Sequence, residues 1–221
     1  MLSEEDAALI KPFLEPVTLK QEDVLFEPFE LITHLHFFEG GLSSEIAIND
    51  DSNRIEVGCA GWEGLSGIPL ILGVDRTPHR AFMQAGGNAL RIQSRDLEQV
   101  MDASRTIRSL LLRFVHVFGI QVAATALADG RYGIEQRLGR WLLMCQDRLG
   151  DELSLTHDFL ALMLGVRRPS VTDALHMLEG NQVIKAERSR ITIRSREKLQ
   201  DVARDAYGVP EAEYRRLILE A

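Results

Sequence analysis

The most constraining feature of the sequence is the run LSLTHDFLALMLGVRRPSVTDALHMLEGNQVIKAERSRITI, which spans Leu153 to Ile193. Thr156 is a good N-cap for a short helix, and Gly165 suits a tight turn at its end. A second helix is expected to begin near Pro169, because the first helical turn tolerates a residue without an N–H donor. Two β-rich runs follow, so the order is helix, turn, helix, hairpin.

The second helix, about 169–179, is expected to have one buried and one open face. Its inward positions have i, i+3, i+4 and i+7 spacing: Val171, Ala174, Leu175 and Leu178. Its polar residues, which include Arg168 and His176, then point outward. The hairpin pairs 183–184 with 191–193 across a polar tip. This is the order of a winged helix-turn-helix, whose second helix enters the major groove of DNA.

Several polar residues of this segment are placed to contact DNA. The start of the second helix offers free N–H groups and a positive dipole end to a phosphate, and its first side chains reach base edges. Arginines at the tip of the hairpin suit phosphate contacts, which give affinity without reading sequence. The candidate DNA-binding residues are Arg167, Arg168, Ser170, Thr172, Asp173, Arg188 and Arg190.

The charge of the chain is unevenly distributed. The formal net charge is −8, but residues 131–198 carry 12 Lys and Arg against 9 Asp and Glu, a net of +3. The remainder carries 13 against 24, a net of −11. Such asymmetry points weakly to nucleic acid, and ordinary scatter of surface charge explains it about as well.

The N-terminal half has a different sequence pattern. Residues 1–15 predict a short amphipathic helix with Ser3 as its N-cap. Glycine and asparagine turns then separate short β-rich runs, which predicts a small sandwich or barrel. These runs are Val24–Phe26, Leu31–Phe38, Glu45–Ile48, Arg54–Val57 and Ala89–Ile92.

A long helical stretch follows, which Ser94 is expected to cap and which continues to about Asp129. Its middle carries two apolar seams, too many for one face of a surface helix. We therefore favour a helix that packs on the β-rich part and on a second copy of the chain, over one buried wholly in its own domain. The candidate dimer-interface residues are Ile107, Leu110, Leu111, Phe114, Val117, Phe118 and Gln121.

The remaining segments complete the outline. Residues 129–133, with two glycines, predict a hinge, and an amphipathic helix is expected from Ile134 to about Leu149. The tail from Leu199 to Ala221 predicts one or two helices broken near Gly208. This tail is either a packing element or a partner site.

Residues 164–175, LGVRRPSVTDAL, together with 176–179 and Ile184, resemble the DNA-binding segment of the Crp/Fnr superfamily of bacterial transcription regulators. The resemblance implies an α+β fold in four parts. These are a jelly-roll-like, cyclic-nucleotide-binding-like β-roll over 1–96, a dimerisation helix and hinge over 97–129, a winged helix-turn-helix over 130–199 and a helical tail over 200–221. It implies a cytoplasmic homodimeric transcription regulator whose partners are double-stranded DNA, RNA polymerase and an unknown small-molecule effector.

The recognition segment departs from the family pattern. In the family this helix opens with a pattern like Ser-Arg-Glu-Thr, with a second Arg three positions later. Here Arg168 keeps the first Arg, Pro169 replaces the Glu and Asp173 replaces the second Arg. The implied fold is unaffected, but the base sequence that better-known members read is not carried over.

The nucleotide-binding pattern of the family is also incomplete. Members that bind a cyclic nucleotide use a Gly-Glu pair and an Arg-Ser/Thr-Ala run. Here Trp62 separates Gly61 from Glu63, and 75–81 matches the second run only in part. We expect no cofactor and no cyclic-nucleotide binding. The alternative function is a ligand-sensing signalling protein in which the effector site of the β-roll is the main function.

Other classes of protein have less support. The two cysteines, Cys59 and Cys145, rule out a disulfide scaffold and a CxxC zinc site, and the histidines show no metal-binding spacing. No nucleophile elbow is present, so we expect no enzyme. No run approaches eighteen uncharged apolar residues and the start is acidic, so we expect a cytoplasmic protein without a membrane partner.

Overall fold

The computed structural model describes residues 2–49 and 53–220. Helix α1 (Glu4–Ile10) and the 3-10 turn η1 (Lys11–Phe13) lead into a β-roll of two four-stranded antiparallel sheets. One sheet has the order β1-β8-β3-β6 and the other β2-β7-β4-β5. The strands are β1 (Glu15–Leu19), β2 (Val24–Phe26), β3 (His34–Phe38), β4 (Leu42–Ile48), β5 (Arg54–Ala60), β6 (Leu65–Ser66), β7 (Arg80–Ala85) and β8 (Gly87–Gln93), with helix α2 (Ile68–Ile71) between β6 and β7.

The prediction of a β-rich N-terminal half is confirmed, but the prediction omitted some of its strands. Each of the five predicted runs overlaps a strand, and Ser3 caps α1 by accepting from the Asp6 N–H. Strands β1, β6 and β7 were not predicted. In β7, four consecutive residues are buried, so the alternation that normally marks a strand is lost. The helix predicted over 1–15 is wrong beyond Phe13, since β1 begins at Glu15 and pairs with β8.

The long helical stretch is two helices, α3 (Ser94–Ala103) and α4 (Arg105–Arg131). The prediction of one helix capped by Ser94 is wrong, because the backbone of Ser104 is extended and interrupts it. The Ser104 hydroxyl accepts from the Ile107 N–H at 3.1 Å and donates to the Asp6 carboxylate at 2.5 Å. Ser104 therefore caps α4 and ties its start to α1.

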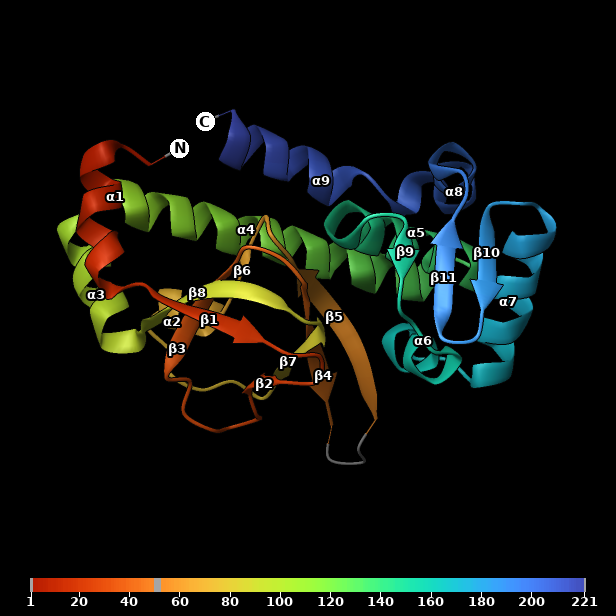
Figure 1. The fold of residues 1–221 in the computed structure, drawn as a ribbon, viewed down its shortest axis with the longest axis horizontal. Coiled ribbons are helices and arrows are strands. Elements are labelled where there is room, and N and C mark those ends of the chain that lie inside the picture. The colour runs from red at the N-terminus through yellow and green to blue at the C-terminus, as the bar shows by residue number, and fades with distance from the viewer. Residues whose placement is uncertain (1, 50–52, 221) are drawn as a thin grey trace.

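Helix α4 lies across the β-roll and joins it to the C-terminal region (Figure 1). Within the described ranges it is the one helix long and apolar enough to cross a membrane by length and composition. In the most apolar 18-residue stretch of α4, only 22% is buried inside the chain. Much of its apolar surface therefore has no partner within this protomer.

The C-terminal region begins with α5 (Ile134–Leu149) and contains a three-stranded sheet of order β10-β11-β9. Its elements are β9 (Glu152–Leu153), α6 (His157–Leu164), α7 (Arg168–Gly180), β10 (Ile184–Glu187) and β11 (Arg190–Ile193). The tail follows as α8 (Arg196–Ala203), η2 (Arg204–Ala206), α9 (Val209–Tyr214) and the π-helical turn η3 (Arg215–Leu219). Helix α8 packs on α5, whereas α9 runs back along α4 and brings the C-terminus near the N-terminus (Figure 1).

The β-roll and the C-terminal region share one hydrophobic cluster, which is crossed by a polar contact. Trp141 of α5 donates its indole N–H to Glu56 Oε1 of β5 at 2.7 Å. Glu56 is fully buried, and its Oε2 has no hydrogen-bond partner in the part of the chain that the structure describes. Burial raises the pKa of Glu56 to about 7, although the Trp141 hydrogen bond and the nearby Arg140 and Arg148 act to lower it.

This raised pKa predicts a pH-dependent stability. The folded chain holds the Glu56 proton more tightly than the unfolded chain, so the stabilisation is complete below about pH 4.5, falls as the pH rises to about 7 and is then constant. Glu56→Gln keeps an acceptor for Trp141 and stays neutral. We expect the variant to gain about 3 kcal/mol of unfolding free energy over wild type between about pH 5 and about pH 8, measured by urea unfolding. A difference that is the same at both pH values contradicts this assignment.

Candidate nucleic-acid interface

The turn between α6 and α7 forms as the sequence predicts. The Thr156 hydroxyl accepts from the Phe159 N–H at 3.2 Å and caps α6. Gly165 ends the helix in the left-handed region, with φ 60°, where a side chain would be strained. Pro169 lies in the first turn of α7, so the missing N–H costs no helical hydrogen bond.

Helix α7 presents its predicted faces. Its four inward residues are each at most 1% exposed, which confirms them as core: Val171, Ala174, Leu175 and Leu178. Arg167, Arg168 and Asp173 are exposed, whereas Ser170 and Thr172 are half-buried. The Thr172 hydroxyl donates to the Arg168 carbonyl at 3.2 Å and lies 3.0 Å from His157 Nδ1. Its hydrogen-bonding capacity is therefore partly used within the chain.

Arg168 is held by an ion pair that sequence reasoning did not identify. Its Nε lies 3.1 Å from Asp158 Oδ1 of α6, and both side chains are more than half exposed. An exposed pair of this kind contributes little to stability, about 0–1 kcal/mol. The Arg168 guanidinium is therefore free to exchange Asp158 for another acceptor.

The hairpin of β10 and β11 is the wing, and its two arginines lie at different positions on it. Arg188 lies at the exposed tip, beside Ser189, whose φ of 59° makes the tight turn. Arg190 is the first residue of β11, opposite Glu187, so its predicted place at the tip is off by one position. Its guanidinium lies 3.8 Å from the Glu152 carboxylate and is more than half exposed.

The predicted dimer-interface residues of α4 mostly face inward, which corrects that assignment. Five of them are buried within their own chain: Ile107, Leu111, Phe114, Val117 and Gln121. Leu110 and Phe118 are half-buried, Leu110 beside the tail and Phe118 against β5. Both seams read from the sequence therefore lie on the side of α4 that the β-roll and the tail cover. The pattern showed that α4 is apolar on several sides but not which side each neighbour covers.

A different face of α4 is open. Its residues follow the 3-4 spacing of a coiled-coil seam, and we call them the open stripe: Leu112, Val115, Gly119, Val122 and Ala126. Leu112 is 43% exposed, Gly119 and Ala126 are exposed, and the two valines are half-buried. A Cβ added at Gly119 would meet nothing within 4 Å. The open stripe is thus an apolar surface with small residues at its centre.

A small cavity lies in the β-roll where its strands meet α4. The cavity between β4, β5, β6, β7 and Phe118 measures about 10 Å³, the room of about one water molecule. Phe118 closes it on the α4 side, since a Cβ on Gly58 would lie 2.6 Å from the tip of its ring. Arg80 pairs with Glu27 at 3.1 Å instead of pointing to this cavity.

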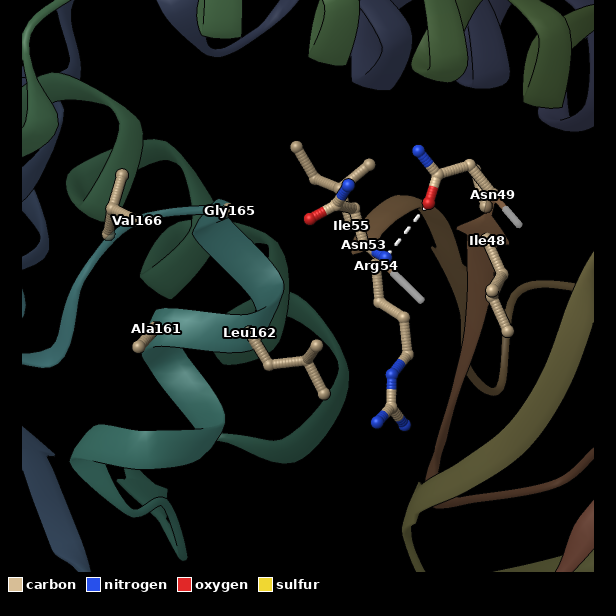
Figure 2. Close-up of a pocket in the computed structure, with 10 residues that line it drawn as sticks. Ile48, Asn49, Asn53, Arg54, Ile55, Ala161, Leu162, Gly165 and Val166 are labelled. Atoms are coloured by element: carbon tan, nitrogen blue, oxygen red, sulfur yellow. Dashed lines mark hydrogen bonds between the residues drawn. The ribbon is translucent and has the colours of Figure 1, made fainter. Parts of the chain in front are cut away.

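The β4–β5 hairpin on one side and α6 with its turn on the other line a crevice of about 630 Å³ (Figure 2). The two sides meet at one edge of this crevice. Ile55 lies on the hairpin side, and a Cβ on Gly165 would come within 2.8 Å of its Cδ1. The hairpin therefore touches the turn that leads into α7. No local sequence pattern could have shown this contact, because it joins residues that are far apart in the chain.

The comparisons with known proteins agree with this geometry. Residues 136–202 match the family model described as the Crp-like helix-turn-helix domain. The C-terminal region is a Crp-like helix-turn-helix domain. No curated protein matches the sequence.

Solved structures extend the likeness in fold to most of the chain. FixK2 from Bradyrhizobium japonicum has a TM-score of 0.71 and 14% identity, covering 86% of this chain and 96% of FixK2. A CRP/FNR-family transcriptional regulator from Thermus thermophilus has a TM-score of 0.69 and 18% identity, covering 87% and 100%. The c-di-GMP responsive global regulator CLP of Xanthomonas campestris has a TM-score of 0.70 and 15% identity, covering 87% and 100%. The fold is that of the Crp/Fnr regulators, as the sequence resemblance implied.

Proposed function

We propose that the protein is a sequence-specific DNA-binding transcription regulator that acts in the cytoplasm as a homodimer, without catalytic activity of its own. The observation that carries the proposal is the Crp-like helix-turn-helix domain with an exposed, arginine-bearing start to its second helix. RNA polymerase is the partner through which such a regulator would act on transcription.

In this proposal α7 enters the major groove. Arg168 stands at the entry of the helix and, once released from Asp158, contacts a guanine through O6 and N7. Arg167, Ser170, Thr172 and Asp173 line the same end of the helix. Their half-buried or exposed positions leave at least part of each side chain accessible.

Arg188 and Arg190 of the wing are proposed to contact phosphate. Both are exposed, and the carboxylates near Arg190, Glu152 and Glu187, are exposed as well. Phosphate contacts position a protein on DNA without reading its sequence. The wing therefore contributes affinity and leaves specificity to α7.

The homodimer is proposed to form through the open stripe of α4. Leaving large apolar side chains such as Leu112 in water forfeits about 1.5–3 kcal/mol each. A glycine at the centre lets the two helices approach closely. Dimeric helix-turn-helix proteins bind half-sites about 34–36 Å apart, one turn of DNA, which is the spacing we propose here.

A titration of mixed-sequence duplex DNA tests the DNA-binding part of the proposal. Fluorescence anisotropy should show binding that weakens as salt increases, because lysine and arginine contacts displace counterions from the phosphates. Arg188→Ala with Arg190→Ala should make the plot of log affinity against log salt shallower. Affinity that does not change with salt, or no binding at low salt, argues against the function.

The small β-roll cavity beside Phe118 predicts that cyclic nucleotides do not bind there. A ligand of that size needs a pocket of about 300 Å³ or more, and this cavity offers about 10 Å³. Calorimetry with cyclic AMP and cyclic GMP should show no saturable heat at micromolar concentration. A stoichiometric titration would contradict this prediction.

A further inference from the structure

A cavity rich in aromatic side chains lies outside the β-roll, under the C-terminal tail. A cavity of about 300 Å³ lies between the β5–β6 loop, α4, α5 and the tail, and we call it the tail cavity. Five aromatic side chains line it: Trp62, Phe114, Phe118, Tyr207 and Tyr214. Its volume is at the lower end of the range of small-molecule sites, which are mostly apolar with a few polar groups.

Two hydrogen bonds hold the walls of the tail cavity together. The Trp62 indole N–H donates to the Asp147 carbonyl of α5 at 3.1 Å, and the Tyr214 hydroxyl of α9 donates to the Glu63 carbonyl at 2.8 Å. The tail thus closes the cavity against the β-roll. Trp62 is nevertheless 57% exposed. Exposing a large apolar ring to water is unfavourable, and such a surface often marks a binding site.

Four of the charged groups on these walls form ion pairs with one another. Arg148 holds Glu63 through two nitrogens, at 2.6 and 2.7 Å, and both side chains are nearly buried. Arg196 holds Asp147 at 2.7 Å, and the Tyr207 hydroxyl donates to the same carboxylate at 2.5 Å. The Glu211 carboxylate accepts from the Gly208 N–H. Arg215 is exposed at the rim. An ionic ligand would have to compete with these pairs, so a neutral ligand fits better.

One polar group remains available. Gln121 is 7% exposed and lines the cavity, and its Oε1 accepts from the Cys59 N–H at 2.7 Å. Because a backbone N–H can only donate, the oxygen faces Cys59 and the amide nitrogen faces away. Among residues 2–49 and 53–220 that nitrogen makes no hydrogen bond, and it is not one of the buried atoms left without a partner, so it is accessible. It can donate a hydrogen bond to a carbonyl or ring nitrogen of a ligand.

We propose that the tail cavity binds a neutral, planar aromatic molecule with a hydrogen-bond acceptor and that this ligand is the effector of the regulator. The aromatic rings would enclose the ligand plane and Gln121 would fix its acceptor. The β-roll and the C-terminal region both supply walls, so a ligand here changes how firmly one is held to the other. The effector role rests on the proposed DNA-binding function, whereas the binding site does not.

Calorimetry on the full chain with coumarin as the probe tests the site. Coumarin is neutral, planar and carries a carbonyl acceptor. We expect one site per chain with a Kd on the order of 100 µM, as is usual for a ligand of this size. Octahydrocoumarin keeps the carbonyl but lacks the aromatic ring, and coumarin-3-carboxylate adds a charge. Both should bind at least about tenfold more weakly.

Two variants at one position give the matched control. Trp62→Ala removes the ring and Trp62→Phe retains one, and both lose the hydrogen bond to Asp147. We expect Trp62→Ala to weaken coumarin binding at least about tenfold and Trp62→Phe to retain most of it. Thermal unfolding checks that both variants fold. No saturable binding of coumarin, equal binding of octahydrocoumarin, or equal affinity in the two variants overturns the site.

The effector role has its own readout. On a duplex that the protein selects, saturating coumarin should change the DNA affinity about fivefold or more, since typical couplings between sites have this size. Coumarin that binds the chain but leaves the DNA affinity unchanged overturns the effector role and keeps the site. If the protein binds no DNA, calorimetry still decides whether the cavity is a ligand site.

Discussion

Gly119→Arg should convert the protein into a monomer that binds its DNA site about 100-fold or more weakly, because the second half-site contact is then no longer linked to the first. Gly119 lies at the centre of the open stripe, where a bulky charged side chain prevents two helices from approaching. Within one protomer a Cβ at this position meets nothing within 4 Å, so the longer side chain starts from open space. Replacing a helical glycine also raises helix propensity by about 1 kcal/mol, so the variant should fold.

Sedimentation velocity at micromolar concentration measures this effect. Gln200→Arg is the matched control, since it adds the same charge at an exposed position of α8. It should sediment as the wild-type dimer. A wild-type monomer, or a Gly119→Arg variant that remains dimeric, contradicts the proposed interface.

Arg168→Ala should weaken binding to the preferred site by about 1–3 kcal/mol per half-site and relax the preference at one base position. The arginine carries this effect because it lies at the exposed entry of α7 and is held only by the exposed Asp158. Competition binding against a set of duplexes with single-base changes measures it. Arg190→Ala serves as the contrast: it should weaken binding to all sequences alike and reduce the salt dependence.

The two arginine variants must differ for the assignment to hold. If Arg168→Ala weakens all sequences uniformly, base reading does not belong to this end of α7. Asp173 needs its own variant, since a carboxylate near DNA is repelled by phosphate unless it accepts from a cytosine amino group. If Asp173→Ala leaves the base preference unchanged, Asp173 does not take part in base recognition.

Local patterns in the sequence predicted the C-terminal region well. The caps and turns at Thr156, Gly165 and Pro169 act within a few residues, so the chain itself carries the information. The periodicity of Val171 to Leu178 identified the buried face of α7 because each turn of a helix repeats it. The same reasoning failed at Ser104, where the hydroxyl serves as cap to the helix that follows.

Features that depend on distant contacts could not be predicted. Helix α4 is apolar on several sides, and only the fold shows that Phe114 faces the β-roll while Gly119 stays open. The small size of the β-roll cavity follows from Phe118 packing on Gly58, two residues that no local pattern connects. The ion pair of Arg168 with Asp158 likewise arises from the angle between two helices.

Selection from a pool of random duplexes with the full-length protein, followed by sequencing, tests whether the protein reads DNA as a two-fold dimer. We expect an enriched motif made of two inverted half-sites whose centres lie about 10 base pairs apart, since a two-fold dimer of helix-turn-helix domains imposes that symmetry and spacing. The Gly119→Arg variant should not enrich this motif. The Arg168→Ala variant should show a weaker base preference at one position in each half-site. A pool that shows no enriched motif, or a motif without two-fold symmetry, would contradict this expectation.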